Sequence, residues 1–91
     1  MDKKTLEYMG ERVDKARKLV KDIDSLDMYI SSLKTGNIRG VFFGSAQQEG
    51  VKLGSYYNSK LTSSIVPEIT AVAIYALENY RDSIQHELDE L

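Results

Sequence analysis

Residues 6–30 read LEYMGERVDKARKLVKDIDSLDMYI, and their hydrophobic pattern sets the architecture of the chain. Apolar residues recur at alternating steps of three and four, a spacing that places them along one side of an α-helix. Asp27 is the one polar interruption of this row. The pattern extends outward into a predicted helix over residues 2–34. The row consists of Leu6, Met9, Val13, Ala16, Val20, Ile23 and Ile30.

A second apolar row lies beside the first in the later half of this helix, at Leu19, Leu26 and Leu33. Together the two rows have the width of a bundle helix face rather than that of a two-stranded zipper. Gly36 follows them, and we expect it to end the helix in the left-handed conformation, which glycine adopts without a Cβ clash. Gly10 is unusual because glycine inside a helix costs about 1 kcal/mol relative to alanine.

Residues 37–57 have a different composition. Four of the six glycines fall here, among residues that favour strands. This pattern predicts a β-hairpin with strands at about 37–44 and 50–56, joined by a polar loop at 45–49. Neighbouring side chains of a strand face opposite sides, so Phe42 and Phe43 cannot both point inward. One of them needs a second apolar surface, such as a helix or a partner chain.

The last helix is predicted over about 62–90. Pro67 lacks an amide hydrogen and is best tolerated in a first turn, so we expect the regular helix to start near Ser63 or Ser64. The first half is apolar on almost every side, which predicts burial on every side. The second half is amphipathic, with a stripe at Leu77, Tyr80, Ile84, Leu88 and Leu91.

Both predicted helices are long for a chain of 91 residues. They would extend about 48 Å and about 42 Å, whereas a compact monomer of this size has a radius of gyration of about 12 Å. Two antiparallel helices meet along a single seam and leave apolar surface uncovered. A symmetric homodimer forming a four-helix bundle covers it, as does a higher oligomer. The alternative is a monomer in which Gly10 or Pro67 breaks a helix and the pieces fold back.

The residues predicted to form the core follow from these stripes. They are Leu6, Met9, Val13, Val20, Ile23, Ile30, Ile69, Val72, Ala76, Tyr80 and Ile84.

Composition excludes several classes of protein. The chain is 42% apolar and 29% charged with one proline and no cysteine, unlike collagen, disordered chains or disulfide scaffolds. The formal charge of -2 offers no basic field, so nucleic acid is not an expected partner. No stretch approaches the roughly 20 apolar residues of a membrane span, and the polar start does not resemble a signal peptide. We therefore expect a cytoplasmic protein that does not act at membranes.

Residues that carry catalysis or bind metals are sparse. His86 is the only histidine, and Asp82 and Glu90 flank it at a spacing compatible with a divalent cation. The simpler interpretation is an exposed histidine near a helix C-terminus. Residues 44–50, GSAQQEG, superficially suggest a phosphate loop, but the glycine spacing and the absence of a following Lys-Ser/Thr reject it. We predict no enzymatic activity, no metal and no cofactor.

The strongest predicted site is the hairpin together with the segment that follows it. Arg39, Lys52 and Lys60 supply positive charge, and Tyr56 and Tyr57 supply stacking faces. Such a set suits a nucleotide or another small anion through charge-assisted hydrogen bonds and aromatic stacking. The simpler alternative is that the two tyrosines end a strand, with one ring on the core and the other on the surface.

Phe42 and Phe43 form a second predicted site, a docking face for another protein. This hypothesis requires that at least one of the two rings is exposed in the free assembly.

The order of a long charged helix, a glycine-punctuated strand pair with Val51-Lys52-Leu53, and an apolar-to-amphipathic closing helix resembles small oligomeric proteins encoded by phages and prophages. Some of those interfere with host defence, including helical proteins that sequester signalling nucleotides. The resemblance covers most of the chain as a layout and implies a small oligomeric accessory protein. It assigns no role to any residue.

We interpret the chain as a single-domain, mainly α (α+β) protein with the order helix, hairpin, helix, which assembles as a dimeric helical bundle. Its expected function is non-enzymatic binding of a macromolecular partner, in addition to itself. The alternative is a protein that binds or sequesters a small anionic ligand such as a nucleotide.

Overall fold

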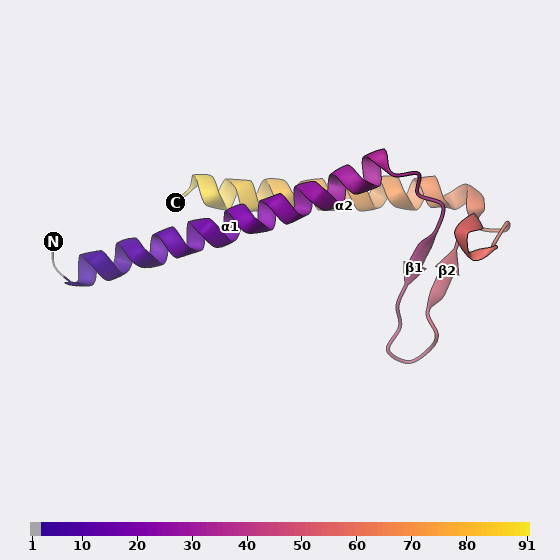
Figure 1. Cartoon of the computed structure of the whole chain (residues 1–91), viewed down its shortest axis with the longest axis horizontal. Coiled ribbons are helices and arrows are strands. Elements are labelled where there is room, and N and C mark those ends of the chain that lie inside the picture. The colour runs from indigo at the N-terminus through magenta and orange to yellow at the C-terminus, as the bar shows by residue number, and fades with distance from the viewer. Residues whose placement is uncertain (1–2) are drawn as a thin grey trace. The chain divides into compact units, whose positions relative to one another are not determined.

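The structure is a computed structural model that describes residues 3–91, and it confirms the predicted order of elements. The chain is mainly helical, with two long helices and a two-stranded antiparallel hairpin between them in sequence (Figure 1). The elements are α1 (Lys3–Thr35), β1 (Val41–Phe43), β2 (Val51–Leu53), the short 3-10 helices η1 (Ser55–Tyr57) and η2 (Ser63–Ile65), and α2 (Val66–Asp89). Asp2, the first residue of the predicted helix, lies outside the described residues.

Neither Gly10 nor Pro67 interrupts a helix. α1 continues through Gly10, where an added Cβ would meet nothing within 4 Å. Pro67 is the second residue of α2, in the first turn, where an amide hydrogen has no partner inside the helix. The alternative in which one of these residues breaks a helix is therefore wrong. α2 also begins two to three residues later than expected, because residues 63–65 form η2 instead.

α1 ends at Gly36 for a different reason from the predicted one. Positive φ angles among the described glycines occur at Gly50 and Gly54, so the expected left-handed cap at Gly36 is wrong. The amide of Gly36 instead donates to the carbonyl of Ser32 at 2.9 Å. A Cβ on Gly36 would lie 2.6 Å from that same oxygen. Glycine fits here because of this close approach to the last helical turn.

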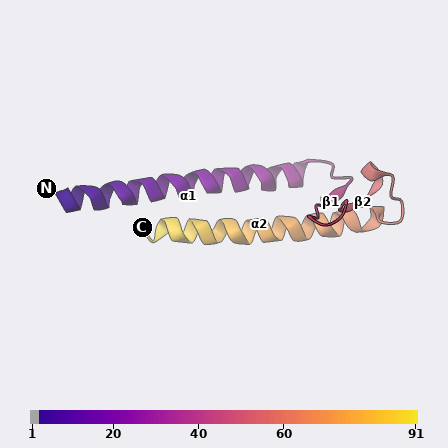
Figure 2. The ribbon, with the colours of Figure 1, turned by 90° about the horizontal axis from the view of Figure 1, so that it is seen from below.

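The chain divides into two compact units. One contains the residues up to Ile30 together with Leu77–Leu91, and the other contains Ser31–Ala76. In the first unit, the segments of α1 and α2 run antiparallel, side by side (Figures 1 and 2). Leu19 and Ile23 of α1 and Ile84 of α2 form its buried cluster. The partly buried residues around this cluster are Leu26, Leu88 and Leu91.

The predicted core is only partly the core of the single chain. Ile23, Ile30 and Ile84 are buried as predicted, and Ile69 is half-buried. Two buried residues were not predicted as core residues. Leu19 is buried in the contact between α1 and α2, and Val66 is buried beside Gly54 in the second unit. The other predicted positions are exposed in the single chain, so their burial in an assembly stays a prediction: Leu6, Met9, Val13, Val20, Val72, Ala76 and Tyr80.

Full burial of the first half of α2 was also wrong for the single chain. Val72 is 67% exposed and Tyr75 is 69% exposed. These sides of the segment are apolar and exposed in the single chain.

The hairpin has shorter strands than the composition predicted. The register pairs Val41 with Leu53, Phe42 with Lys52, and Phe43 with Val51. β2 ends at Gly54, whose φ of 100° turns the chain out of the strand and into η1. The prediction of a strand up to residue 56 was therefore wrong, and so was the alternative that made the two tyrosines a strand end.

A network of short-range hydrogen bonds holds the second unit together around Gly54. Its amide donates to Oγ1 of Thr62 at 2.9 Å, and its carbonyl accepts the amides of Tyr57 and Ser59 at 3.1 and 3.0 Å. Val66 is 2% exposed and lies where a side chain on Gly54 would point, since an added Cβ would come within 2.7 Å of it. These contacts satisfy the backbone of a buried turn, which would otherwise be costly.

We predict that Gly54→Ala destabilises the protein by about 2–4 kcal/mol, because alanine resists a positive φ and its Cβ would come within 2.7 Å of Val66. Gly10→Ala is the matched control, and we expect it to stabilise the chain by about 0.5–1 kcal/mol. Urea unfolding at one fixed protein concentration measures both changes. Equal free energies of unfolding for the two variants would contradict this account of the turn.

Candidate functional site

The single chain leaves much of its hydrophobic surface in contact with solvent. Among residues 3–91, five hydrophobic residues are buried, whereas sixteen large ones are exposed. Exposed apolar surface of this extent in a folded chain indicates interaction sites.

The largest such region on α1 is the part of its heptad row that α2 does not cover. We call it the heptad surface and define it by Leu6, Met9, Val13, Ala16 and Val20. Val13 is 48% exposed and Val20 is 45% exposed, so each offers about half of its side chain to a partner. All of these residues except Ala16 were predicted to lie in the core, and they are exposed on the outside of the first unit.

A shallow groove runs along the heptad surface. Val13, Ala16 and Val20 are its apolar lining residues, and the charged lining residues are Arg17, Lys21 and Asp24. An apolar groove between charges of both signs is typical of a helix-binding surface, in which the apolar residues supply affinity and the charges select orientation. The steps of three and four in the sequence were the signal for this groove.

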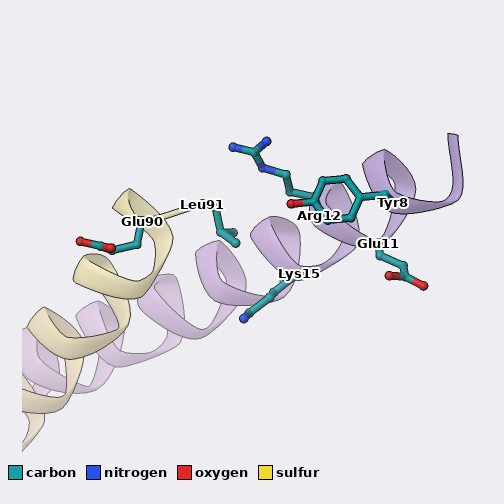
Figure 3. Close-up of a pocket in the computed structure, with 6 residues that line it drawn as sticks. All are labelled: Tyr8, Glu11, Arg12, Lys15, Glu90 and Leu91. Atoms are coloured by element: carbon teal, nitrogen blue, oxygen red, sulfur yellow. The ribbon is translucent and has the colours of Figure 1, made fainter. Parts of the chain in front are cut away.

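A second hollow lies where the end of α2 meets the early turns of α1 (Figure 3). Its lining consists of Tyr8, Glu11, Arg12 and Lys15 of α1 together with Glu90 and Leu91, which directly follow α2. The Leu91 side chain points toward α1, and that of Glu90 points away from it (Figure 3). The two basic and two acidic groups balance, so this hollow has no preference for an anion or a cation.

Ion pairs flank the seam between α1 and α2 in the first unit. Lys15 Nζ lies 3.3 Å from Glu87 Oε1, and the Arg81 guanidinium pairs with Asp27 through two hydrogen bonds. The hydrogen bond to Asp27 raises the pKa of Arg81 above its ordinary value. Each pair joins α1 to α2, so these charges belong to the packing of the two helices.

A further ion pair lies within α1, where Lys18 donates to Asp22 at 2.9 Å. This hydrogen bond raises the pKa of Lys18. The raised pKa lies far above neutrality, so Lys18 keeps its charge at physiological pH.

The hairpin unit brings together three of the five predicted ligand residues. The amide of Tyr56 donates to the carbonyl of Arg39 at 3.0 Å, and the rings of Tyr56 and Tyr57 meet edge to face at 5.0 Å. Gly40 allows this approach, since a Cβ there would lie 2.8 Å from Tyr56 and 3.0 Å from the Tyr57 ring. Arg39 and Tyr56 are exposed, and Tyr57 is half-buried.

The other two predicted ligand residues have different surroundings. Lys52 is exposed on β2 directly opposite Phe42. Lys60 is exposed in the turn after η1, where its carbonyl accepts hydrogen bonds from Ser63. No contact found among residues 3–91 joins either lysine to the tyrosine pair.

Phe42 and Phe43 are both half exposed, at 51% and 50%. The Phe42 ring lies over Gly50, where a Cβ would come within 2.9 Å of it. Phe43 pairs with Val51 on the opposite face, and Val51 is also exposed. The described part of the chain gives this sheet only two strands, so both outer edges are open to a further strand.

Metal and membrane sites have little support in the described residues. His86 Nε2 lies 3.5 Å from Glu90, and no group of three or more His, Cys, Asp or Glu residues between positions 3 and 91 is arranged to hold a metal ion. Neither of the long helices, as far as they are described, has the length and hydrophobicity needed to cross a bilayer.

No protein-family model, curated protein sequence or solved structure matches the chain.

We predict that Phe43→Ser changes the free energy of unfolding by less than about 1 kcal/mol, because half of the ring is already in water. The matched comparison is Val66→Ala, which removes part of a fully buried side chain and should cost about 2 kcal/mol. Thermal and urea unfolding measure both values. A loss for Phe43→Ser as large as that for Val66→Ala would assign the ring to the fold instead of to docking.

Proposed function

We propose that the protein is a non-enzymatic, self-associating interaction protein that acts by binding a macromolecular partner. One observation carries the proposal: the heptad surface of α1 is exposed although α1 already packs against α2. A helix row with coiled-coil spacing is suited to a second helix, and one chain supplies no helix for this row.

The exposed surface of the chain supports self-association. Exposed hydrophobic side chains occur both on the heptad surface of α1 and on the hairpin. A stable protein interface buries about 800 Å² on each partner. These two separate surfaces can serve a homodimer and a separate partner.

The hairpin supports binding of another protein. Phe43 and Val51 present an exposed apolar pair on one face of the sheet, and Phe42 lies on the other face. Aromatic residues are enriched at the energetic centres of protein interfaces, and an open sheet edge adds main-chain hydrogen bonds. Both features favour a protein partner over a small ligand at this sheet.

We predict a mass of about twice 10.3 kDa or a higher multiple in solution, measured by light scattering over a dilution series. Val13→Glu should weaken association at least about tenfold, because it places a charge in the apolar groove.

Tyr29→Glu is the matched control, since Tyr29 is equally exposed on α1 but lies outside the heptad surface. Circular dichroism checks that both variants remain helical. A wild-type chain that is a folded monomer at all concentrations would contradict the proposal.

A second candidate function is binding of a small anionic ligand such as a nucleotide. The observation that favours it is the backbone bond and ring contact that hold Arg39, Tyr56 and Tyr57 in one place. An exposed arginine on a backbone held beside an exposed tyrosine suits a ligand in which a phosphate is joined to a flat base.

For this candidate we predict that a nucleotide raises the melting temperature of the wild-type chain and that Arg39→Ala abolishes the shift. Arg12→Ala is the control, because it removes an exposed arginine from the first unit and should leave the shift unchanged. A melting temperature that no nucleotide in a screen changes would remove this candidate.

A further inference from the structure

We propose that two copies of the chain pair through their heptad surfaces with their α1 helices antiparallel. The inference rests on the self-association proposed above and specifies the surface, the direction and the register. The partner is a second copy of this chain, because the surface pairs with itself in a register that leaves no polar residue in the seam.

The hydrophobic pattern selects the register. With Val13 of one copy opposite Ala16 of the other, Met9 comes to lie opposite Val20. Leu6 lies at the level of Ile23, which is apolar and already buried against Ile84 of its own chain. The two-fold axis repeats these layers, so every layer of the seam is apolar. Val13, Ala16 and Val20 are also the apolar lining of the groove, which the residues of the second copy would fill.

The two neighbouring registers are worse. A shift of one heptad toward the C-terminal end of α1 places Met9 opposite Asp27, whose carboxylate already pairs with Arg81. A shift of one heptad toward the N-terminal end of α1 leaves Val20 without an apolar residue opposite it. Only the middle register covers the heptad surface from Leu6 to Val20.

Charges beside the seam favour the antiparallel direction. In the register given above, Asp24 of one copy lies beside Lys3 of the other, and this pair occurs twice by symmetry. The long side chain of Arg17 meets Gly10, where the open space accommodates it. A parallel pair in register would instead place Arg12 beside Arg17 on both sides of the seam, and like charges there are repulsive.

The end of α2 leaves room for such a partner. Leu91 reaches α1 near Tyr8 and Lys15, so the turns of α1 before Tyr8 extend beyond α2 in the first unit (Figure 2). In the antiparallel pair these turns, including Leu6, pack along α1 of the second copy. The overlap covers residues 3–26 of each helix, about 36 Å.

Disulfide trapping tests this arrangement, because the chain has no cysteine of its own. Met9→Cys and Val20→Cys are made as separate single variants, one of them carrying a size tag, then mixed and oxidised. In the proposed register a cysteine at 9 faces one at 20, and a disulfide between the two variants should be the main crosslinked product. Like positions lie about 16.5 Å apart along the seam, beyond the roughly 7 Å limit of a disulfide.

Each alternative outcome has a distinct meaning. Disulfides within each single variant and none between them would establish a parallel pair and overturn the inference. Glu11→Cys is the control, because Glu11 is exposed on the opposite face of α1. A dimeric mass with no more crosslinked product than this control gives would place the interface elsewhere and also overturn the inference. In that case the proposed self-association stands. A monomeric mass for wild type and variants overturns both proposals.

Discussion

The structure depends on a mismatch between the apolar width of α1 and the one helix that packs on it. α1 carries two hydrophobic rows, and a single antiparallel neighbour covers one seam. Ile84 of α2 packs with Leu19 of the second row and also with Ile23 of the first row. The earlier part of the first row, at Leu6, Met9, Val13 and Val20, is left with half-exposed side chains. Folding of the single chain and association of two chains thus use adjacent strips of the same helix.

The hairpin unit is stabilised by different means. Its most buried side chain is Val66, and the glycine beside it, Gly54, is held by hydrogen bonds from a turn of serine and threonine residues. The phenylalanines of the sheet contribute much less to this core because half of each ring is exposed. The unit can therefore present aromatic side chains to a partner without depending on them for its own fold.

The sequence was sufficient to predict both long helices and the hairpin, because hydrophobic period and glycine clustering are local signals. It was insufficient to tell which row of α1 faces α2, since both rows have helical spacing and the choice depends on a partner distant in sequence. The second strand was predicted too long because Gly54 turns the backbone out of the sheet. The left-handed conformation predicted for Gly36 was wrong, since its amide donates to the carbonyl of Ser32 instead. Among the predicted ligand residues, Arg39 comes close to the two tyrosines through a turn for which the sequence contains no recognisable motif.

Asp27 shows how the two uses of α1 are kept apart. By spacing it belongs to the first row, where a carboxylate in an apolar seam would be costly. The structure pairs it with Arg81 of α2, so this charge belongs to the intrachain packing. The exposed apolar run of the row, which is available to another molecule, ends at Val20, before Asp27. A surface bounded in this way limits how far a second helix can slide, and a limited slide is what gives a coiled-coil contact a single register.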